Sequence, residues 1–220
     1  KKIYITGVSG FIGSKVAKYY LEKDYNVIGF TRNSASSIRS ELGIEVINFD
    51  FNSKEELQLD YADSIIHCAT ANDVLSKDAE AGLALSIFGT NRLLEACKKA
   101  KIKNIIFFST AQVYGTELIG NFDEEIPIKI ETSYALNHYL GEELCKFYCN
   151  THGFNIVAFR PSNIYGIPEI STVNRKTLVP MCFVNEAINM GTIKLRSSGK
   201  QMRNFVSLEQ MAEITISTAP

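Results

Sequence analysis

The sequence lacks any apolar run that approaches the roughly 18 residues of a membrane-spanning helix. Its first residues, Lys1 and Lys2, lead into a strand-like stretch instead of a signal sequence. Among the 5 cysteines, at positions 68, 97, 145, 149 and 182, there is no CxxC pair, and no histidine lies at the spacing of a metal ligand. We therefore expect a cytoplasmic protein without a membrane partner or a metal site, whose cysteines are reduced and mostly packed.

The chain also lacks an excess of charge of either sign. Its 220 residues include 23 Lys and Arg against 24 Asp and Glu, spread evenly along the sequence. A protein that binds nucleic acid needs a basic surface, so we expect no nucleic-acid partner. A hydrophobic content of 45% in a chain of this length allows one domain with a substantial core and a small additional region.

A strand and a glycine-rich turn open the chain. The alternating Ile3 and Ile5 predict a short buried strand, which is followed by the turn TGVSGFIG and by a helix from Phe11 to Lys23. The glycines let the backbone turn sharply and approach a ligand closely, and the first amides of the helix can donate to a phosphate. The GxxGxxG spacing therefore predicts a bound dinucleotide, although the commoner fingerprint is GxGxxG.

Strand-like and helical patterns alternate along the rest of the chain. We expect further strands at residues 26–31, 44–50, 64–69, 104–109, 154–160 and 193–195. We expect helices at residues 78–100, 133–152 and 178–190, and from residue 208 onward. This alternation predicts an α/β protein with a doubly wound parallel sheet, the Rossmann fold, whose crossovers are right-handed.

Ligands of such sheets bind at the carboxyl ends of the strands. Thr31 and Arg32 stand at the end of the second strand, where an acidic side chain would accept a hydrogen bond from the ribose of NAD. We therefore predict that Arg32 contacts the 2′-phosphate of NADP(H). The alternative is that NAD(H) binds while Arg32 lies in solvent. Asp50 and Phe51, after the third strand, would border the adenine. We expect His67 to be a hydrogen-bonded core residue and not a contact of the cofactor.

Four motifs follow in order along the second half of the chain. They are STAQVYG at residues 109–115, SYALNHYLGEE from residue 133, RPSNIYG at residues 160–166 and GKQMRNFV at residues 199–206. Together with the glycine turn, their order and spacing resemble an extended short-chain dehydrogenase/reductase of the NAD-dependent epimerase/dehydratase family, whose members act on nucleotide sugars. The resemblance extends from Lys2 to about Ala212.

The resemblance implies roles for individual residues. Thr110 would hydrogen-bond the reacting oxygen of the substrate, and Tyr134 would be the general acid and base. Asn163 and Arg203 would hold the nucleotide diphosphate. Ser86 stands where the family usually has asparagine. The residues that we expect at the cofactor are Gly7, Ser9, Gly10, Phe11, Ile12, Gly13, Thr31, Arg32, Asp50, Phe51, Cys68, Ala69, Thr70, Ser86, Tyr134 and His138.

One departure from the family bears on the chemistry. The family has YxxxK, whose lysine binds the nicotinamide ribose and lowers the pKa of the tyrosine, whereas here Tyr134 is followed by His138. His138 could still bond a ribose hydroxyl, but a histidine with an unperturbed pKa of about 6.5 is only about a quarter protonated at pH 7. Oxidation of an alcohol needs the tyrosinate, and reduction of a ketone can begin from the neutral phenol.

We therefore predict that the protein reduces a keto sugar with NADPH, using Tyr134 as the proton donor. An NAD-dependent 4-epimerase or dehydratase of a nucleotide sugar is the closest alternative, and its first step is an oxidation. A cofactor-binding module without turnover, in which Tyr134 is not activated, is the third.

The sequence also predicts how the chain is organised. Residues 1–166 form the dinucleotide-binding Rossmann domain, and residues 167–220 form a partial substrate-binding region. The last helix stops at Pro220 with no further strand, so we expect the sequence to be part of a longer chain.

The two long helices, at residues 78–100 and 133–152, carry apolar residues on more than one face. Leu136, Leu140 and Leu144 are expected to face the core. Pairing with a second copy would cover the remaining apolar face, and we expect a homodimer through these helices.

Overall fold

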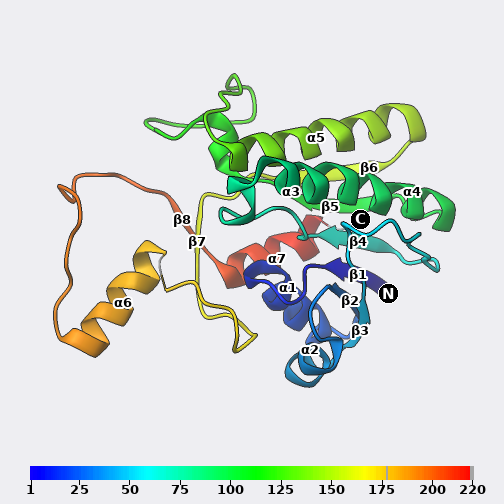
Figure 1. Cartoon of the computed structure of the whole chain (residues 1–220), viewed down its shortest axis with the longest axis horizontal. Helices are drawn as coiled ribbons and strands as arrows, with labels where there is room; N and C mark the ends of the chain where they lie inside the picture. The colour runs from blue at the N-terminus through cyan, green and yellow to red at the C-terminus, as the bar shows by residue number, and fades with distance from the viewer. Residues whose placement is uncertain (177, 219–220) are drawn as a thin grey trace.

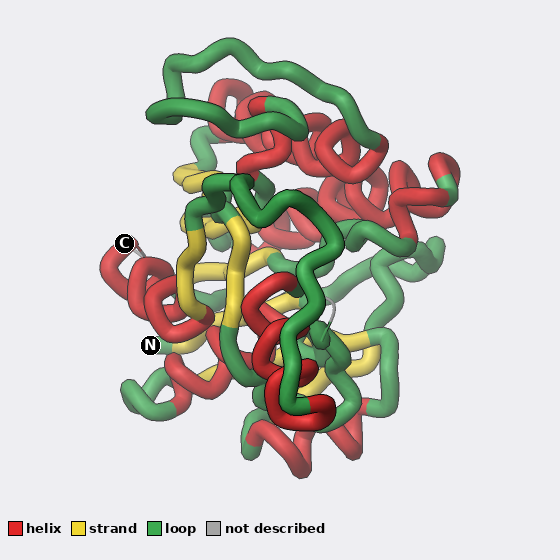
Figure 2. Tube along the Cα trace, turned by 90° about the vertical axis from the view of Figure 1, so that its left-hand side faces the viewer, coloured by secondary structure: helices red, strands yellow, loops and turns green. Residues whose placement is uncertain are grey.

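The structure, a computed structural model, describes residues 1–176 and 178–218. Its centre is a six-stranded sheet in the order β3-β2-β1-β4-β5-β6, and every neighbouring pair of strands is parallel (Figure 1, Figure 2). The strands are β1 (Lys2–Thr6), β2 (Asn26–Thr31), β3 (Glu45–Asn48), β4 (Ser64–His67), β5 (Asn104–Phe108) and β6 (Asn155–Phe159). The predicted doubly wound sheet is confirmed, and its strand order changes direction between β1 and β4, where such folds bind ligands.

Helices cover both faces of this sheet (Figure 1). The face that carries Ile3 and Ile5 packs against α1 (Phe11–Leu21), α2 (Ala35–Leu42) and α7 (Leu208–Thr218). The face that carries Tyr4 packs against α4 (Thr90–Ala100) and α5 (Ser133–His152). Successive side chains of a strand point to opposite faces, so β1 contributes apolar groups to both cores.

The helix predicted at residues 78–100 is interrupted. It consists of α3 (Ala79–Leu83), a π-helical turn η2 (Ala84–Gly89) and α4. A short helix, η1 (Leu75–Lys77), precedes it. The π-helical turn points Ser86 into the interior, where its hydroxyl accepts a hydrogen bond from the Ala71 amide at 3.1 Å. The wider turn thereby anchors the segment after β4, a feature that apolar periodicity does not reveal.

The C-terminal region differs from the prediction in one element. Residues 193–195, predicted as a strand, form a loop in which Ile193 and Leu195 are exposed. A two-stranded parallel sheet is formed instead by β7 (Asn163–Tyr165) and β8 (Phe205–Ser207), with α6 (Val179–Met190) between them in sequence. Within the described residues the 193–195 triplet pairs with no strand, so its β propensity is not realised.

The core-facing side of α5 also differs from the prediction. Cys145 and Tyr148 are buried, whereas Leu136 is exposed and Leu140 and Leu144 are only partly buried. Leu144 still packs against the core, whereas Leu136, at the start of the helix, lies toward the outside.

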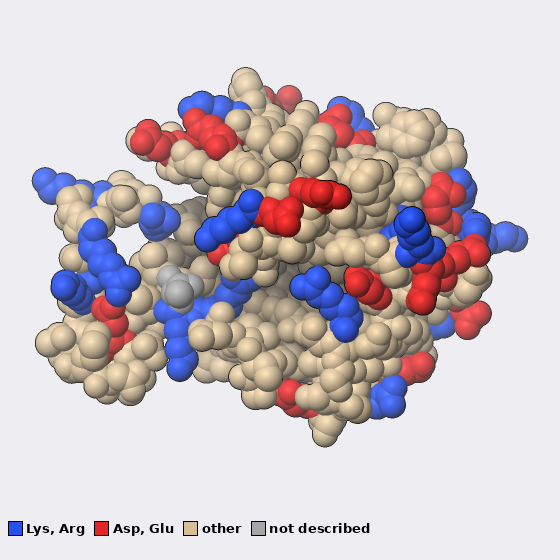
Figure 3. All heavy atoms as spheres, in the orientation of Figure 1, with Lys and Arg blue, Asp and Glu red and all other residues tan. Residues whose placement is uncertain are grey.

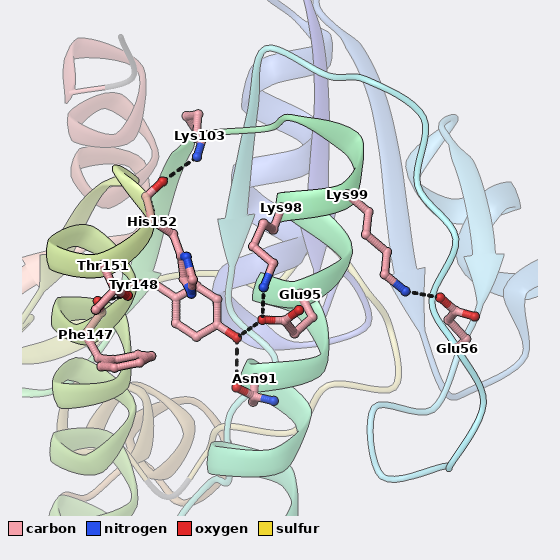
Figure 4. Close-up of polar contacts among 10 residues, drawn as sticks. All are labelled: Glu56, Asn91, Glu95, Lys98, Lys99, Lys103, Phe147, Tyr148, Thr151 and His152. Carbon is pink, nitrogen blue, oxygen red and sulfur yellow. Dashed lines mark hydrogen bonds and ion pairs between the residues drawn. The ribbon is translucent and has the colours of Figure 1, made fainter.

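Polar contacts join α4 and α5 (Figure 4). The Tyr148 hydroxyl lies 2.5 Å from Glu95 Oε1 and 3.0 Å from Asn91 Oδ1, both on α4. Glu95 also pairs with Lys98, and a hydrogen bond from this ammonium, followed by the one from Tyr148, lowers the pKa of the Glu95 carboxyl. A buried tyrosine with its hydroxyl satisfied fixes the orientation of α5 against α4.

The described residues contain no helix long and apolar enough to cross a membrane. Nor do they contain a group of three or more His, Cys, Asp and Glu side chains arranged to hold a metal ion. The cysteines are free; on α5, Cys145 is buried in the core and the partly buried Cys149 packs against it.

His67 lies in the interior beside α4, as expected. Its Nδ1 lies 2.7 Å from Thr6 Oγ1, and its Nε2 lies 2.9 Å from Thr90 Oγ1. The Thr6 oxygen already accepts from the amides of Cys68 and Ala69, so its proton goes to Nδ1, and Nε2 carries the ring proton. The prediction of a hydrogen-bonded core histidine is confirmed, and burial lowers the pKa of His67 to about 3.

We expect acid to destabilise the fold through His67. A histidine whose folded-state pKa lies below its unfolded value of 6.5 stabilises the fold fully above pH 6.5 and loses this contribution as the pH falls toward 3. Between pH 6.5 and 5 the free energy of unfolding should fall by up to about 2 kcal/mol, at about 1.4 kcal/mol per pH unit. Urea unfolding at pH 7 and pH 5 measures this loss, which His67→Gln should reduce and His152→Gln, at the end of α5, should leave unchanged. Equal losses in wild type and His67→Gln would contradict the prediction.

Candidate active site

A cavity of about 280 Å³ opens where the strand order of the sheet changes direction. The glycine turn after β1 and the residues that follow β2, β3, β4 and β5 form its wall. The predicted cofactor residues on this wall are Gly7, Ser9, Gly10, Phe11, Ile12, Gly13, Thr31, Arg32, Asp50, Phe51, Cys68, Ala69, Thr70, Tyr134 and His138. Segments that are distant in the sequence therefore converge on one hollow.

The glycine turn packs too closely to accommodate side chains. Gly7 has a φ of +70°, in the left-handed region that favours glycine. A Cβ on Gly13 would lie 2.3 Å from the Gly7 carbonyl oxygen, and one on Gly10 would lie 3.1 Å from the same atom. The start of α1 can therefore lie directly against the turn, and within the described residues no side chain caps it. Backbone amides at such a helix start suit a phosphate group.

Hydroxyl groups hold the walls of the cavity together. Thr31 Oγ1 donates to Ser9 Oγ at 3.0 Å and ties the end of β2 to the glycine turn. Thr6 Oγ1 accepts from the amides of Cys68 and Ala69, each at 3.1 Å, and ties the end of β1 to the segment after β4. Arg32 follows Thr31 and is exposed at the rim of the cavity.

Ser109, at the carboxyl end of β5 where ligands of such sheets bind, adds a polar group to the wall. Its hydroxyl oxygen is buried and has no hydrogen-bond partner among the described residues. An unpaired buried hydroxyl is costly, and a ligand in the cavity would give it a partner. With the glycine turn and the uncapped start of α1, it fits a bound nicotinamide dinucleotide.

Tyr134 and His138 lie one turn apart on α5, and both line the cavity. Their ring centroids are 4.3 Å apart. His138 Nδ1 lies 2.9 Å from the Tyr134 carbonyl oxygen, which can only accept, so Nδ1 carries the ring proton and Nε2 accepts from the Thr70 hydroxyl at 3.1 Å. Burial lowers the pKa of His138, so the ring is neutral at pH 7 and does not supply the charge of the family's lysine.

Burial raises the pKa of the Tyr134 phenol. A hydrogen bond with the Thr110 side chain and the charge of Arg175 lower this pKa, and the charge of Asp73 raises it. Thr110 is buried next to the wall, and its hydroxyl accepts from the Gln112 amide at 3.2 Å at the start of η3 (Ala111–Tyr114). The neutral phenol is therefore the dominant form at pH 7.

A buried ion pair holds α5 against the STAQVYG segment. Arg160, which follows β6, donates through Nε to Glu142 Oε1 at 3.0 Å and through Nη2 to Oε2 at 2.6 Å. Its Nη1 donates to the Tyr114 hydroxyl at 2.6 Å. Bidentate charge-assisted bonds are directional, so this cluster fixes the helix of Tyr134 relative to the loop of Thr110.

Three further predicted site residues lie off the cavity wall. Ser86 is fully buried and bonded to the Ala71 amide, so it supports the wall from behind. The small sheet pairs Asn163 with Phe205, and Asn163 Nδ2 donates to the carbonyl of Asn204, the residue after Arg203, at 2.9 Å. Their contact with a substrate stays a prediction.

Arg175 is a wall residue that sequence reasoning missed. It lies in the loop between β7 and α6 and lines the same cavity as Tyr134 and His138. Its Nη1 lies 3.3 Å from Asp73 Oδ1, a residue 102 positions away in the chain. No motif marks Arg175, and only the fold brings it to the site.

The comparison with protein families agrees with this geometry. Residues 3–218 match the family described as the NAD dependent epimerase/dehydratase family. The chain belongs to this family. It is therefore an enzyme, and the resemblance inferred from its motifs is confirmed.

Two curated relatives and one solved structure illustrate the similarity. The UDP-N-acetyl-alpha-D-glucosaminuronate decarboxylase of Bacillus cytotoxicus is 30% identical, over 98% of this chain and 70% of its own length. The dTDP-D-glucose 4,6-dehydratase of Dictyostelium discoideum is 28% identical, over 96% of this chain and 54% of its own length. The crystal structure of UDP-glucuronic acid 4-epimerase from Bacillus cereus, in complex with UDP-glucuronic acid and NAD, has a TM-score of 0.83 at 25% identity and covers 99% of this chain and 72% of that one.

Proposed function

We propose that this enzyme binds a nicotinamide dinucleotide in the cavity and acts on a carbonyl or hydroxyl carbon of a nucleotide sugar. The observation that carries the proposal is the convergence of the glycine turn and Tyr134 on one cavity wall. A bound nicotinamide gives or takes the hydride. The Tyr134 phenol can protonate the oxygen of a ketone, and the Thr110 hydroxyl beside it can orient that oxygen.

Reduction of a keto sugar is the direction that the protonation states favour. Burial raises the pKa of Tyr134 and lowers that of His138, so both side chains are neutral at pH 7. A neutral phenol can donate its proton at once, whereas an oxidation has to begin from the minor phenolate form. We therefore propose keto-sugar reduction with Tyr134 as the proton donor.

Epimerisation or dehydration of a nucleotide sugar is the second candidate function. The similar proteins favour it, since one is a UDP-glucuronic acid 4-epimerase and another is a dTDP-D-glucose 4,6-dehydratase. Such a reaction would begin with an oxidation, in which Tyr134 accepts a proton. A net reduction consumes the reduced cofactor, whereas an epimerisation starts from the oxidised cofactor and regenerates it in each turnover, so the fate of the cofactor separates the two.

We also propose that NADP(H) is preferred over NAD(H). Arg32 stands exposed at the rim of the cavity, and the hydroxyls of Ser34 and Ser36, 2.9 Å apart, lie just beyond it in sequence. A guanidinium forms strong charge-assisted bonds with a phosphate such as the 2′-phosphate of NADP(H). The solved 4-epimerase named above holds NAD, which makes NAD(H) the alternative.

The C-terminal region carries the charge that a nucleotide diphosphate would need. Basic side chains gather on the part of the surface at the left of Figure 3. The basic residues of the C-terminal region are Arg175, Lys176, Lys194, Arg196, Lys200 and Arg203. The proposed substrate-binding region spans residues 167–220 and follows the dinucleotide-binding domain of residues 1–166, with Asn163 and Arg203 as diphosphate contacts.

A homodimer through the outer faces of η2 and α5 is a further part of the proposal. Phe88, Leu136 and Phe147 have 67%, 39% and 53% of their surfaces exposed there. Burial of such apolar surface against a second copy is favourable, at about 25 cal/mol per Å².

Turnover of a panel of nucleotide sugars and their 4-keto forms tests the reaction. Tyr134→Phe should lower the rate by about 10²- to 10⁴-fold and leave cofactor binding intact. His138→Lys should accelerate NADP-driven oxidation more than NADPH-driven reduction, because only oxidation needs the phenolate. Equal acceleration of both directions would contradict the preference for reduction. Cofactor binding without conversion of any member of the panel would favour the third alternative, a cofactor-binding module without turnover.

Titration with NADPH and NADH tests the choice of cofactor. Arg32→Gln should weaken NADPH binding by about 1.5 to 3 kcal/mol, which is roughly 10- to 150-fold, and leave NADH binding nearly unchanged. Lys23→Gln removes an exposed charge away from the cavity and is the matched control. Equal losses for both cofactors in Arg32→Gln would argue against a 2′-phosphate contact.

Light scattering tests the dimer. The wild-type protein should show twice the mass of the chain at micromolar concentration, and Phe147→Glu should shift it toward the monomer. The control Lys146→Glu alters a neighbouring exposed position without removing an apolar group. A monomeric wild type would refute the proposed assembly.

A further inference from the structure

Among the described residues that line the cavity, the permanently charged cations are Arg32 and Arg175. Arg32 follows β2, on the side where the adenosine end of the cofactor is proposed. Arg175 comes from the loop between β7 and α6, and its charge acts on the phenol of Tyr134. His138 stands where the family motif has a lysine, and its ring is neutral, so α5 contributes no cation to the described wall of the cavity.

Arg175 is paired with Asp73 at the edge of a second, neighbouring hollow. The two side chains form an ion pair at 3.3 Å, in which 32% of the arginine side chain and 68% of the aspartate side chain are exposed. Both residues line this second hollow, which has a volume of about 310 Å³ and shares Ser9 and Gly10 with the first. An ion pair with this exposure contributes little to stability. The ion pair matters because it fixes the position of the Arg175 guanidinium charge.

Four side chains influence the electrostatic environment of the Tyr134 phenol. Thr110 comes from the end of β5, and His138 comes from the next turn of α5. Arg175, from the loop before α6, lines the same cavity as Tyr134, and Asp73, from the loop after β4, is paired with Arg175. The first two are neutral at pH 7. The charge near the phenol therefore comes from one cation and one anion that are paired with each other.

We propose that Arg175 is a positioning residue that supplies the positive charge stabilising the Tyr134 phenolate, in place of the lysine that His138 replaces, and that Asp73 weakens this effect. The inference rests on the proposed function in so far as Tyr134 is the group that transfers the proton. In this chain, a loop of the C-terminal region supplies the positive charge that the lysine of the family motif supplies from the position of His138 on α5.

A purely structural role for Arg175 makes a different prediction. If Arg175 only tethers its loop to the segment after β4, then Arg175→Gln and Asp73→Asn break the same tether and act alike. If its charge acts on the phenol, the two variants shift the titration of Tyr134 in opposite directions, because one removes a cation and the other removes an anion.

The test places a fluorinated tyrosine at position 134 of the full chain and follows its ¹⁹F chemical shift against pH, without substrate. Fluorine lowers the pKa of the phenol into a range in which the fold is stable, and the signal reports one tyrosine of the 10 in the chain. The titration midpoint should move to higher pH in Arg175→Gln, stay near that of wild type in Arg175→Lys and move to lower pH in Asp73→Asn. Added salt should reduce these shifts, since both charges are partly exposed.

Shifts in the same direction for Arg175→Gln and Asp73→Asn, or no shift in Arg175→Gln, would overturn the inference. In a His138→Lys background a lysine supplies the missing charge, so Arg175→Gln should move the midpoint less than it does in wild type. An undiminished shift there would show that Arg175 does not stand in for the lysine.

Turnover measurements keep this inference separate from the proposed function. If the expected ¹⁹F shifts appear but no nucleotide sugar is converted, the role of Arg175 stands and the proposed function fails. If the wild-type enzyme converts a nucleotide sugar but the shifts are missing, the proposed function stands and the role of Arg175 fails.

Discussion

The close approach of α1 to the carbonyl group of Gly7 is the contact on which the rest of the site depends. A Cβ on Gly13 would lie 2.3 Å from that carbonyl oxygen, which is closer than any side chain can pack. Because position 13 has no side chain, α1 begins directly against the turn, and its first residues form part of the cavity wall. The facing wall is set from β1 as well, since the Thr6 hydroxyl holds the amides of Cys68 and Ala69. One short strand therefore positions both sides of the cavity.

Two neutral histidines connect β1 and the segment after β4 to the helices α4 and α5. His67 carries its proton on Nε2, because the Thr6 hydroxyl donates to Nδ1, and a second ring proton would set two donors against each other. His138 carries its proton on Nδ1, because the Tyr134 carbonyl can only accept, and Thr70 satisfies its other nitrogen. Both rings are buried, and burial lowers the pKa of each. The lack of charge on the His138 ring is therefore a property of the packed interior, in addition to the choice of residue at position 138.

Local patterns in the sequence were sufficient for the sheet and for most of the cavity wall. Buried parallel strands need apolar groups on both faces, and residues after their carboxyl ends meet at one edge, so the wall could be predicted from strand positions. The spacing of Tyr134 and His138 likewise places them on one face of a helix. Local patterns failed where the deciding partner is remote or the helix is irregular. The apolar triplet at 193–195 has no strand beside it in the described structure, a π-helical turn moves Ser86 behind the wall, and Arg175 reaches the site through a loop that no motif marks.

If Arg175 supplies the positive charge near Tyr134, proton transfer by this phenol depends on a segment outside α5. A lysine on α5 would keep a fixed distance from the phenol, whereas Arg175 lies on a loop whose position is set by β7, α6 and the contact with Asp73. Coulomb interactions grow as distance shortens and as water is excluded. On the proposed role of Arg175, a sugar bound in the cavity would exclude water from the guanidinium and strengthen its hold on the phenolate. The phenol would then be a weak acid in the open site and a stronger one around substrate, so that proton transfer becomes coupled to substrate binding.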